Sequence, residues 1–211
     1  DLVHQAIPER FGRKLRVIHQ SSPPLKTPRR LSTRWFEVCI AGHLREEKDS
    51  LRAAYAARLV SADSKLRVVH LGKAIEESWA RDARAEMAGN SRFVWRGEVP
   101  GWQVRRQFAR SHAMVISSIM EGGANIVSEA IVCGVPVIAS NIDGNIGLLG
   151  PDYQGYFPAT DEVALAALLQ RAETDPAFLP SLARQCRAKK NLFAPAKEKA
   201  AWRALLKEMG I

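Results

Sequence analysis

Two carboxylates and a pair of glycines lie close together in the second half of the chain. Glu121 is followed at once by Gly122 and Gly123, and Glu129 comes eight residues after Glu121. Glycine lets the backbone approach a ligand closely. A helix that begins just after the glycines would turn unpaired N–H groups and its positive dipole end toward an anion. A diphosphate suits such a site, and the carboxylates could accept hydrogen bonds from sugar hydroxyl groups.

The helix is predicted to begin near Asn125, a residue type that is common at N-caps. Glu129 would lie one turn later on the same side, where it could bind the vicinal diol of a ribose. Either carboxylate alone is unremarkable, because the helix dipole favours Glu in a first turn and Gly-Gly is common in loops. The two together, before the Gly-Val-Pro-Val run at 134–137, are more specific.

Short apolar runs alternate with helix-like periodicity from about residue 35. Strands are predicted at 36–41, 66–71, 92–96, 113–117 and 135–139, and helices at 49–60, 75–88, 101–111, 125–133, 161–174, 176–191 and 196–209. Such alternation predicts a parallel sheet between helices, a three-layer α/β/α Rossmann-like domain. Polar ligands bind at the carboxyl ends of the strands of such sheets, and Glu121 follows a strand there.

The first thirty residues differ from the rest of the chain. The run 14–20 alternates like a strand, and prolines at 23, 24 and 28 then interrupt it. The chain does not begin with Met, and its first residues look like the middle of an element. We therefore expect 1–30 to be the end of an N-terminal domain and a linker. Residues 31–211 would form a C-terminal domain that includes the helices after about 176.

Composition places the chain among ordinary globular proteins. Of 211 residues, 46% are hydrophobic and 25% charged, and no apolar run approaches the roughly 18–20 residues of a transmembrane helix. The net charge of +9 suits acidic ligands. The one basic cluster, 26–30, contains Pro and no aromatic residue, which favours a solvated linker over a nucleic-acid groove.

The cysteines and histidines indicate no metal or nucleophilic site. Cys39, Cys133 and Cys186 share no short spacing, so we expect buried free thiols, which fits a cytoplasmic protein. His70 and His112 are expected to be structural.

The segment 121–140 resembles the donor-site motif of retaining glycosyltransferases of family 4, the group 1 glycosyl transferases with a GT-B fold. Their signature is Glu-Gly, a variable stretch, Glu-Ala and then Gly-x-Pro-Val-Ile-Ala, and Glu121 and Glu129 keep its seven intervening residues. The resemblance covers about 35–210. It implies the C-terminal, donor-binding half of a GT-B fold, with a UDP-sugar as donor. It also implies that no metal or other cofactor is needed, and that the chain's own N-terminal Rossmann-like domain mainly holds the acceptor.

The resemblance also implies residue roles. The loop 42–49 is similar to the family's first strand-to-helix loop, whose Arg and Lys hold the donor diphosphate. Lys48 matches the Lys; His43 stands at the Arg position and Arg45 two residues later, so which of them replaces the Arg stays open. Glu121 would orient the donor sugar and Glu129 would hold the ribose. The other implied donor-binding residues are Gly97, in the loop that receives the base, and Gly122, Gly123, Ala124, Asn125 and Ile126.

The chain departs from the family pattern at two places. Gly123-Ala124 stands where many members have Phe-Gly, and Gly147 where the family often has Glu, which leaves sugar and acceptor open. The combination of 42–49, 121–130 and 144–150 also resembles a branch associated with selenosugar synthesis, whose acceptor would be selenophosphate. The alternatives are an epimerase or phosphorylase on the same fold, a non-catalytic nucleotide-binding module, and a basic nucleic-acid-binding domain.

Overall fold

The strands of the computed structural model, which describes residues 7–211, form one parallel sheet. Its order is β3-β2-β1-β4-β5-β6. The sheet order reverses between β1 and β4, and in open α/β sheets this switch point opens a crevice at the carboxyl ends of the strands. The bounds are β1 Phe36–Ala41, β2 Leu66–Leu71, β3 Phe93–Trp95, β4 Ala113–Ile116, β5 Val137–Ser140 and β6 Tyr156–Phe157.

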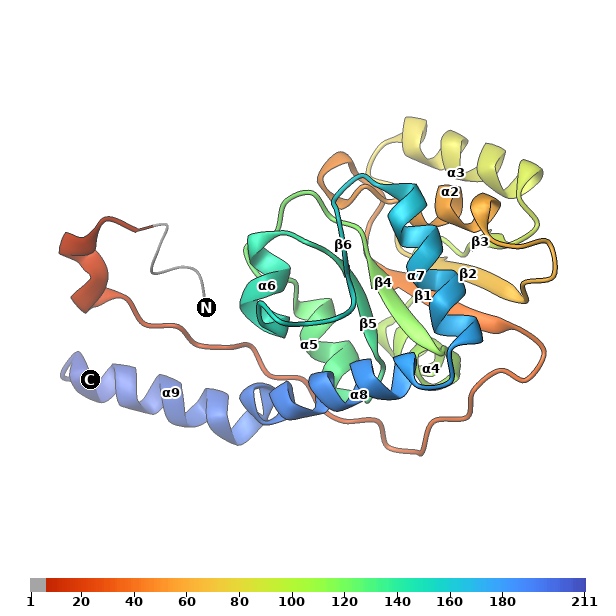
Figure 1. Cartoon of the computed structure of the whole chain (residues 1–211). Helices are drawn as coiled ribbons and strands as arrows, with labels where there is room; N and C mark the ends of the chain where they lie inside the picture. Colours follow the sequence, from red (N-terminus) through yellow and green to blue (C-terminus); the bar gives the residue numbers. More distant parts are fainter. Residues whose placement is uncertain (1–6) are drawn as a thin grey trace.

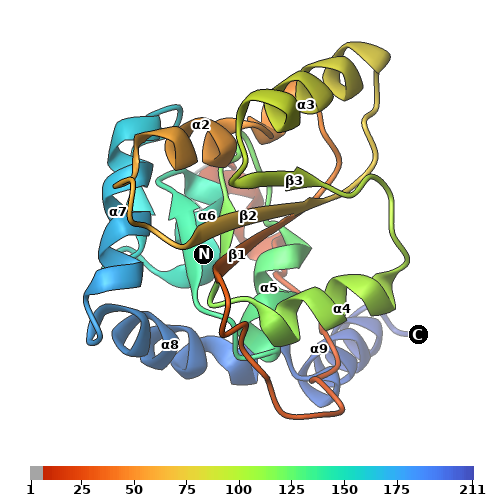
Figure 2. The same ribbon diagram turned by 90° about the vertical axis from the view of Figure 1, so that its right-hand side faces the viewer.

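Helices cover both faces of the sheet, as Figures 1 and 2 show. Helices α2 and α3 lie on one face and α4 and α5 on the other, and α7 packs beside α2. The α-helices are α2 Arg52–Leu59, α3 Glu77–Gly89, α4 Gly101–Arg110, α5 Asn125–Val132, α6 Asp143–Leu149, α7 Glu162–Thr174, α8 Phe178–Lys189 and α9 Pro195–Glu208. Short 3-10 helices are η1 Glu9–Lys14, η2 Glu46–Lys48 and η3 Lys190–Phe193.

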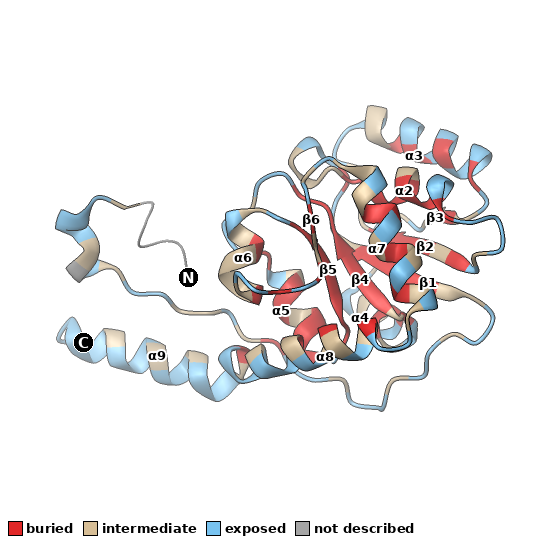
Figure 3. Ribbon diagram, viewed as in Figure 1, coloured by how far each residue is buried: buried red, intermediate tan, exposed pale blue. Residues whose placement is uncertain are grey.

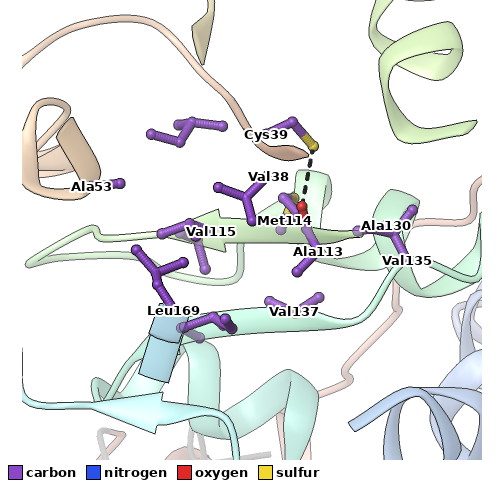
Figure 4. Close-up of a cluster of buried hydrophobic side chains, with 14 of the residues drawn as sticks. Val38, Cys39, Ala53, Ala113, Met114, Val115, Ala130, Val135, Val137 and Leu169 are labelled. Carbon is purple, nitrogen blue, oxygen red and sulfur yellow. Dashed lines mark hydrogen bonds between the residues drawn. The ribbon is translucent and has the colours of Figure 1, made fainter. Parts of the chain in front are cut away.

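The core lies between the central strands and their helices. Burial is concentrated on β1, β2, β4 and β5, while α9 contains no buried residue (Figure 3). Val38, Val115 and Val137 pack with Leu169 of α7, and the Cys39 thiol donates to the Ala113 carbonyl (Figure 4). Burial of these apolar side chains, at about 25 cal/mol per Å² removed from water, holds the layers together. As predicted, all three cysteines are buried and unpaired.

Most of the predicted strands and helices are confirmed to within a few residues, and the differences lie at the N-terminal stretch, at the start of α2, and at α6 and β6. The predicted strands at 36–41 and 66–71 match β1 and β2. The strand predicted at 14–20 is wrong: η1 ends at Lys14, and the following chain is extended but pairs with no strand of the described sheet. Helix α6 and β6 were not predicted, because α6 contains two glycines and β6 has only two residues.

The first helix of the domain also begins later than predicted. The helix predicted at 49–60 has its N-cap at Leu51, so neither Asp49 nor Ser50 caps it. Asp49 has a left-handed backbone, with φ of 45°, and ends η2. Its carboxylate bonds to Arg52 at 2.7 Å instead of capping a backbone N–H.

The segment 22–30 lies against the rest of the structure and is held there by Arg29. The guanidinium of Arg29 donates to the carbonyl groups of Gly134 and Ser111. Backbone bonds from Ser22 to Phe193, 3.2 Å, and from Arg30 to Ala109, 2.8 Å, fix the chain on either side. The basic cluster is thus exposed as predicted except at Arg29, whose side chain is clamped.

The N-terminal stretch and α9 leave the sheet side by side (Figure 1). Arg16 forms an ion pair with Glu208, and the Ser21 N–H donates to Glu198 at 3.0 Å. None of the helices in residues 7–211 has the length and apolar character that a membrane crossing requires.

Candidate functional site

Two loops meet at the switch point of the sheet. One follows β1 and carries His43, Arg45 and Lys48; the other follows β4 and carries Glu121 and the glycines. Ser117 Oγ donates to the carbonyl groups of Lys48 and Asp49, at 3.2 and 2.9 Å. A backbone bond of 2.9 Å from Ile119 to Glu47 adds to these contacts. The fold therefore fixes one loop against the other.

The structure brings the predicted Lys48 and Glu121 together. The Lys48 ammonium forms an ion pair with Glu121 Oε1, and the Ser118 hydroxyl donates to the same oxygen at 2.7 Å. The Lys48 and Glu121 side chains are only 22% and 10% exposed. A cation and a carboxylate thus share one partly buried position at the carboxyl end of β4.

The amino end of α5 faces this position without a side-chain cap. The N-cap is Ala124, whose carbonyl accepts from Val127 N–H at 2.9 Å. Asn125 is therefore the first helical residue, and the prediction that it caps the helix is wrong. Within residues 7–211, the N–H groups of Asn125 and Ile126 have no hydrogen-bond partner. These free donors and the helix dipole form a site suited to an anion.

A pocket of ≈ 460 Å³ opens beside the α5 terminus. Glu121, Gly122, Gly123, Asn125 and Ser128 form one wall. Sequence reasoning missed the other walls, which come from Asp143, Gly144, Gly147 and Leu148 of α6 and from residues 17–20 of the N-terminal stretch. The signal for α6 was present, because Asp143 and Gly144 follow a strand at the same edge of the sheet.

A second cavity of ≈ 220 Å³ lies on the other side of α5. His43 and Ile126 line it, together with Glu98 and Val99 of the loop after β3. Gly97 has a positive φ of 68° and accepts a backbone bond from Gly72 at 2.8 Å, but it is not itself a lining residue. The loop predicted to receive a nucleotide base therefore borders a cavity that adjoins the α5 terminus.

Arg45 and Glu129 lie outside the walls of both cavities. Arg45 Nε is 3.0 Å from Glu47 Oε1, and both side chains are more than 40% exposed. Glu129 lies one turn into α5 and is half-buried, and burial raises the pKa of its carboxyl although Arg105 opposes the shift. Of the two candidates for the second cation, the structure places His43 at a cavity wall and Arg45 toward solvent.

The buried side chain of His70 supports the loop that follows β1. Its ring is buried, and burial lowers the pKa of His70 to about 4, so the ring is neutral near pH 7. Nε2 lies 2.9 Å from the Gly42 carbonyl, which can only accept, so Nε2 carries the proton and donates. Nδ1 has no partner in residues 7–211, and the ring borders a cavity of ≈ 30 Å³ with Lys48 and Ser50. The prediction of a structural histidine holds for its burial and for one of its nitrogens.

Comparison with known proteins identifies the family to which the chain belongs. The family model for glycosyl transferases group 1 matches residues 28–191. The putative teichuronic acid biosynthesis glycosyltransferase TuaC of Bacillus subtilis (strain 168) is 28% identical over 144 residues, which are 64% of this chain and 36% of TuaC. Among solved structures, Anabaena Alr3699/HepE in complex with UDP-glucose has a TM-score of 0.72 at 17% identity, covering 82% of this chain and 49% of that one.

A second structural relative matches nearly the whole chain. The apo form of the lipopolysaccharide outer core galactosyltransferase WaaB has a TM-score of 0.70 at 15% identity, covering 99% of this chain and 58% of WaaB. The chain thus spans 36% to 58% of the length of these relatives. The chain shares its Rossmann-like fold with GT-B glycosyltransferases. Because the family model matches well over half of its residues, the chain belongs to the group 1 glycosyl transferases.

Proposed function

We propose that this domain binds a nucleotide diphosphate sugar, a UDP-sugar, as the donor for transfer to an acceptor. The observation that carries the proposal is that Glu121, which is paired with the Lys48 ammonium, lines one pocket together with Asn125, at the α5 terminus with its free N–H groups. Two kinds of group are needed to hold such a donor. Cations and N–H groups hold the diphosphate, and a carboxylate accepts hydrogen bonds from the sugar.

The same groups would act in the transfer step. As the bond between the sugar and the diphosphate breaks, negative charge grows on the leaving phosphate oxygens. Lys48 and the N–H groups of Asn125 and Ile126 would stabilise that charge, and donors fixed before the reaction lower the barrier without reorganisation. Glu121 would orient the sugar. Arg45 would supply a second positive group, or His43, whose Nδ1 accepts from the Lys73 N–H at 3.1 Å, would donate from Nε2, so that no metal is required.

The nucleoside would extend from the diphosphate toward the second cavity. Its base would lie by the loop after β3, near Glu98 and Val99, and Glu129 would accept from the ribose hydroxyl groups. Support comes from a relative with the same fold, since Alr3699/HepE has been solved with UDP-glucose. Retention of configuration at the sugar rests on the family resemblance alone.

The acceptor would be held mainly by an N-terminal Rossmann-like domain of the full protein, with the site between the two domains. Residues 1–30 would be the end of that domain and the linker, and 31–211 the donor domain. The 211-residue chain would then bind donor without transferring sugar. The proposal places the reaction in the cytoplasm, in keeping with three buried, unpaired thiols. Selenophosphate, the acceptor of the selenosugar branch, is a candidate acceptor for the full protein.

Calorimetric titration of the chain with UDP, UDP-glucose and UDP-N-acetylglucosamine, with EDTA present, tests the proposal. Saturable binding is expected without metal, and comparison of the three ligands ranks the sugars. A folded chain that binds none of them would contradict a preformed UDP-sugar site in this domain. Sugar transfer by the chain alone would contradict the assignment of the acceptor to another domain.

A further inference from the structure

The cation proposed to hold the donor diphosphate is already neutralised in the free protein. Lys48 forms its ion pair with Glu121, and the Ser118 hydroxyl donates to the same carboxylate oxygen at 2.7 Å. The bonds between the two loops hold the backbone on both sides of this pair. An incoming phosphate group must therefore compete with the Glu121 carboxylate for the Lys48 ammonium.

The Lys48–Glu121 ion pair is largely shielded from water, so competition from Glu121 should weaken phosphate binding substantially. Exposed ion pairs contribute little because water screens them, but the Glu121 side chain is only 10% exposed and that of Lys48 22%. A charge-assisted hydrogen bond in such a place is about twice as strong as a neutral one. A carboxylate that loses its cation there keeps Ser118 as its one partner among residues 7–211, and an incompletely paired charge away from water is costly.

A nucleotide sugar and a sugar-free nucleoside diphosphate would interact differently with the Lys48–Glu121 ion pair. A nucleotide sugar brings hydroxyl groups that can donate to Glu121, so the carboxylate stays paired when Lys48 turns to the phosphates. A sugar-free nucleoside diphosphate has no such hydroxyl group and adds negative charge near Glu121. The N–H groups of Asn125 and Ile126 would serve both ligands alike, so the difference lies in the ion pair.

We propose that Glu121 competes with phosphate for Lys48 and thereby makes the site select sugar-bearing over sugar-free nucleoside diphosphates. Glu121 is then a specificity-determining residue as well as a ligand of the sugar. The same competition would weaken rebinding of the diphosphate product after transfer. The inference rests on the proposed function and adds that one residue has opposite effects on the two ligands.

The test is the dissociation constant of UDP and of UDP-glucose for the wild-type chain and for Glu121→Gln, measured by calorimetry. The amide of Gln can still accept from Ser118 but forms no ion pair with Lys48. We expect UDP to bind the variant more tightly, by about fivefold or more for the loss of a charge-assisted competitor, and UDP-glucose to bind it more weakly. Thermal unfolding checks that the variant folds.

Asp143→Asn is the matched control, because Asp143 lines the same pocket and has no ion pair with Lys48 among the described residues. If both variants tighten UDP binding equally, the effect is long-range charge and the inference is wrong. Unchanged or weaker UDP binding by Glu121→Gln, with the wild-type chain binding both ligands, also overturns it. Failure of the wild-type chain to bind either ligand contradicts the proposed function as well.

Discussion

Gly144 of α6 lies against the backbone of Glu121 with no room for a side chain. A Cβ atom added to Gly144 would stand 2.2 Å from the Glu121 carbonyl oxygen. No such contact is tolerated between real atoms, so the substitution must separate α6 from the loop after β4. The close packing of these two residues sets the position of Glu121 between two walls of the pocket.

Gly144→Ala is therefore expected to displace Glu121. Overpacking of this kind typically costs about 1–3 kcal/mol of stability, and we expect UDP-glucose affinity to fall at least tenfold. Gly147→Ala is the control, since Gly147 lines the same pocket but a Cβ there would meet no atom within 4 Å. Denaturant unfolding and calorimetry on both variants provide the measurements. Equal behaviour of the two would show that the contact does not position Glu121.

Glu129 is expected to contribute to nucleotide binding through hydrogen bonds from the ribose hydroxyl groups. Its replacement by Ala removes a charged hydrogen-bond acceptor worth roughly 1.5–3 kcal/mol, so UDP affinity should fall about tenfold or more with folding retained. A UDP analogue without the ribose 2′- and 3′-hydroxyl groups should bind wild type and variant equally. If the analogue is as sensitive to the substitution as UDP, Glu129 does not contact the ribose.

The protonation state of the Glu129 carboxyl is expected to make the affinity for UDP depend on pH. Burial raises the pKa of Glu129 above its ordinary value, and the ionised form accepts hydrogen bonds more strongly, with both oxygens, than the protonated form. UDP affinity should therefore decline as pH falls through this raised pKa, at a higher pH than an ordinary Glu would give. In Glu129→Gln this part of the pH profile should disappear. Calorimetric titrations between pH 7.5 and about 5 would show it.

His70 makes the stability of the domain depend on pH. The unfolded chain binds a proton at this histidine below its ordinary pKa of 6.5, but in the folded protein burial lowers the pKa to about 4. The contribution is fully present above pH 6.5 and is lost as pH falls toward 4, with a total on the order of 3 kcal/mol. His70→Gln should keep a donor for the Gly42 carbonyl and remove this dependence. Urea unfolding of both proteins at pH 7 and pH 5 is the check; parallel losses of stability would contradict it.

Arg29 is expected to hold the linker to the domain. Its guanidinium donates to the carbonyl groups of Gly134 and Ser111, and each hydrogen bond to a charged group contributes roughly 1.5–3 kcal/mol. Arg29→Met should lower the unfolding free energy by about 3 kcal/mol or more and speed proteolysis of the segment 22–30. Arg30, whose side chain is exposed, is the control. Equal protease sensitivity of the two variants would argue against the clamp.

Sequence patterns were informative where one local rule decides the structure. Strands β1 and β2 are buried apolar runs that end at glycine, and their bounds follow from that pattern alone. Glu121 and Lys48 could each be named from the resemblance, but their ion pair joins residues 73 positions apart and depends on the order of the sheet. The contribution of α6 to the pocket was missed because its two glycines weaken the helix signal, although one of them, Gly144, is needed for close packing against Glu121.

The alternation of apolar and polar residues at 14–20 is a case in which a local pattern did not decide the structure. Period-two alternation predicts a strand only if a neighbouring strand offers its hydrogen bonds. Here the neighbours are α9 and η3: Arg16 within the run forms an ion pair with Glu208, and the N–H groups of Ser21 and Ser22, just after the run, each donate one hydrogen bond. Likewise, Asn125 has a side chain that is common at N-caps, but the N-cap of α5 lies one residue earlier, at Ala124. Tertiary packing decided both.

The most direct test of the donor site is amide NMR of the ¹⁵N-labelled chain during titration with UDP. Asn125 and Ile126 N–H groups have no partner in the described structure, and the proposal assigns them to the diphosphate. Their resonances should shift most on saturation, together with those of the loop that carries Lys48, and Lys48→Ala should weaken the binding. Binding that leaves these amides unperturbed, or shifts that cluster at another surface, would contradict the proposed site.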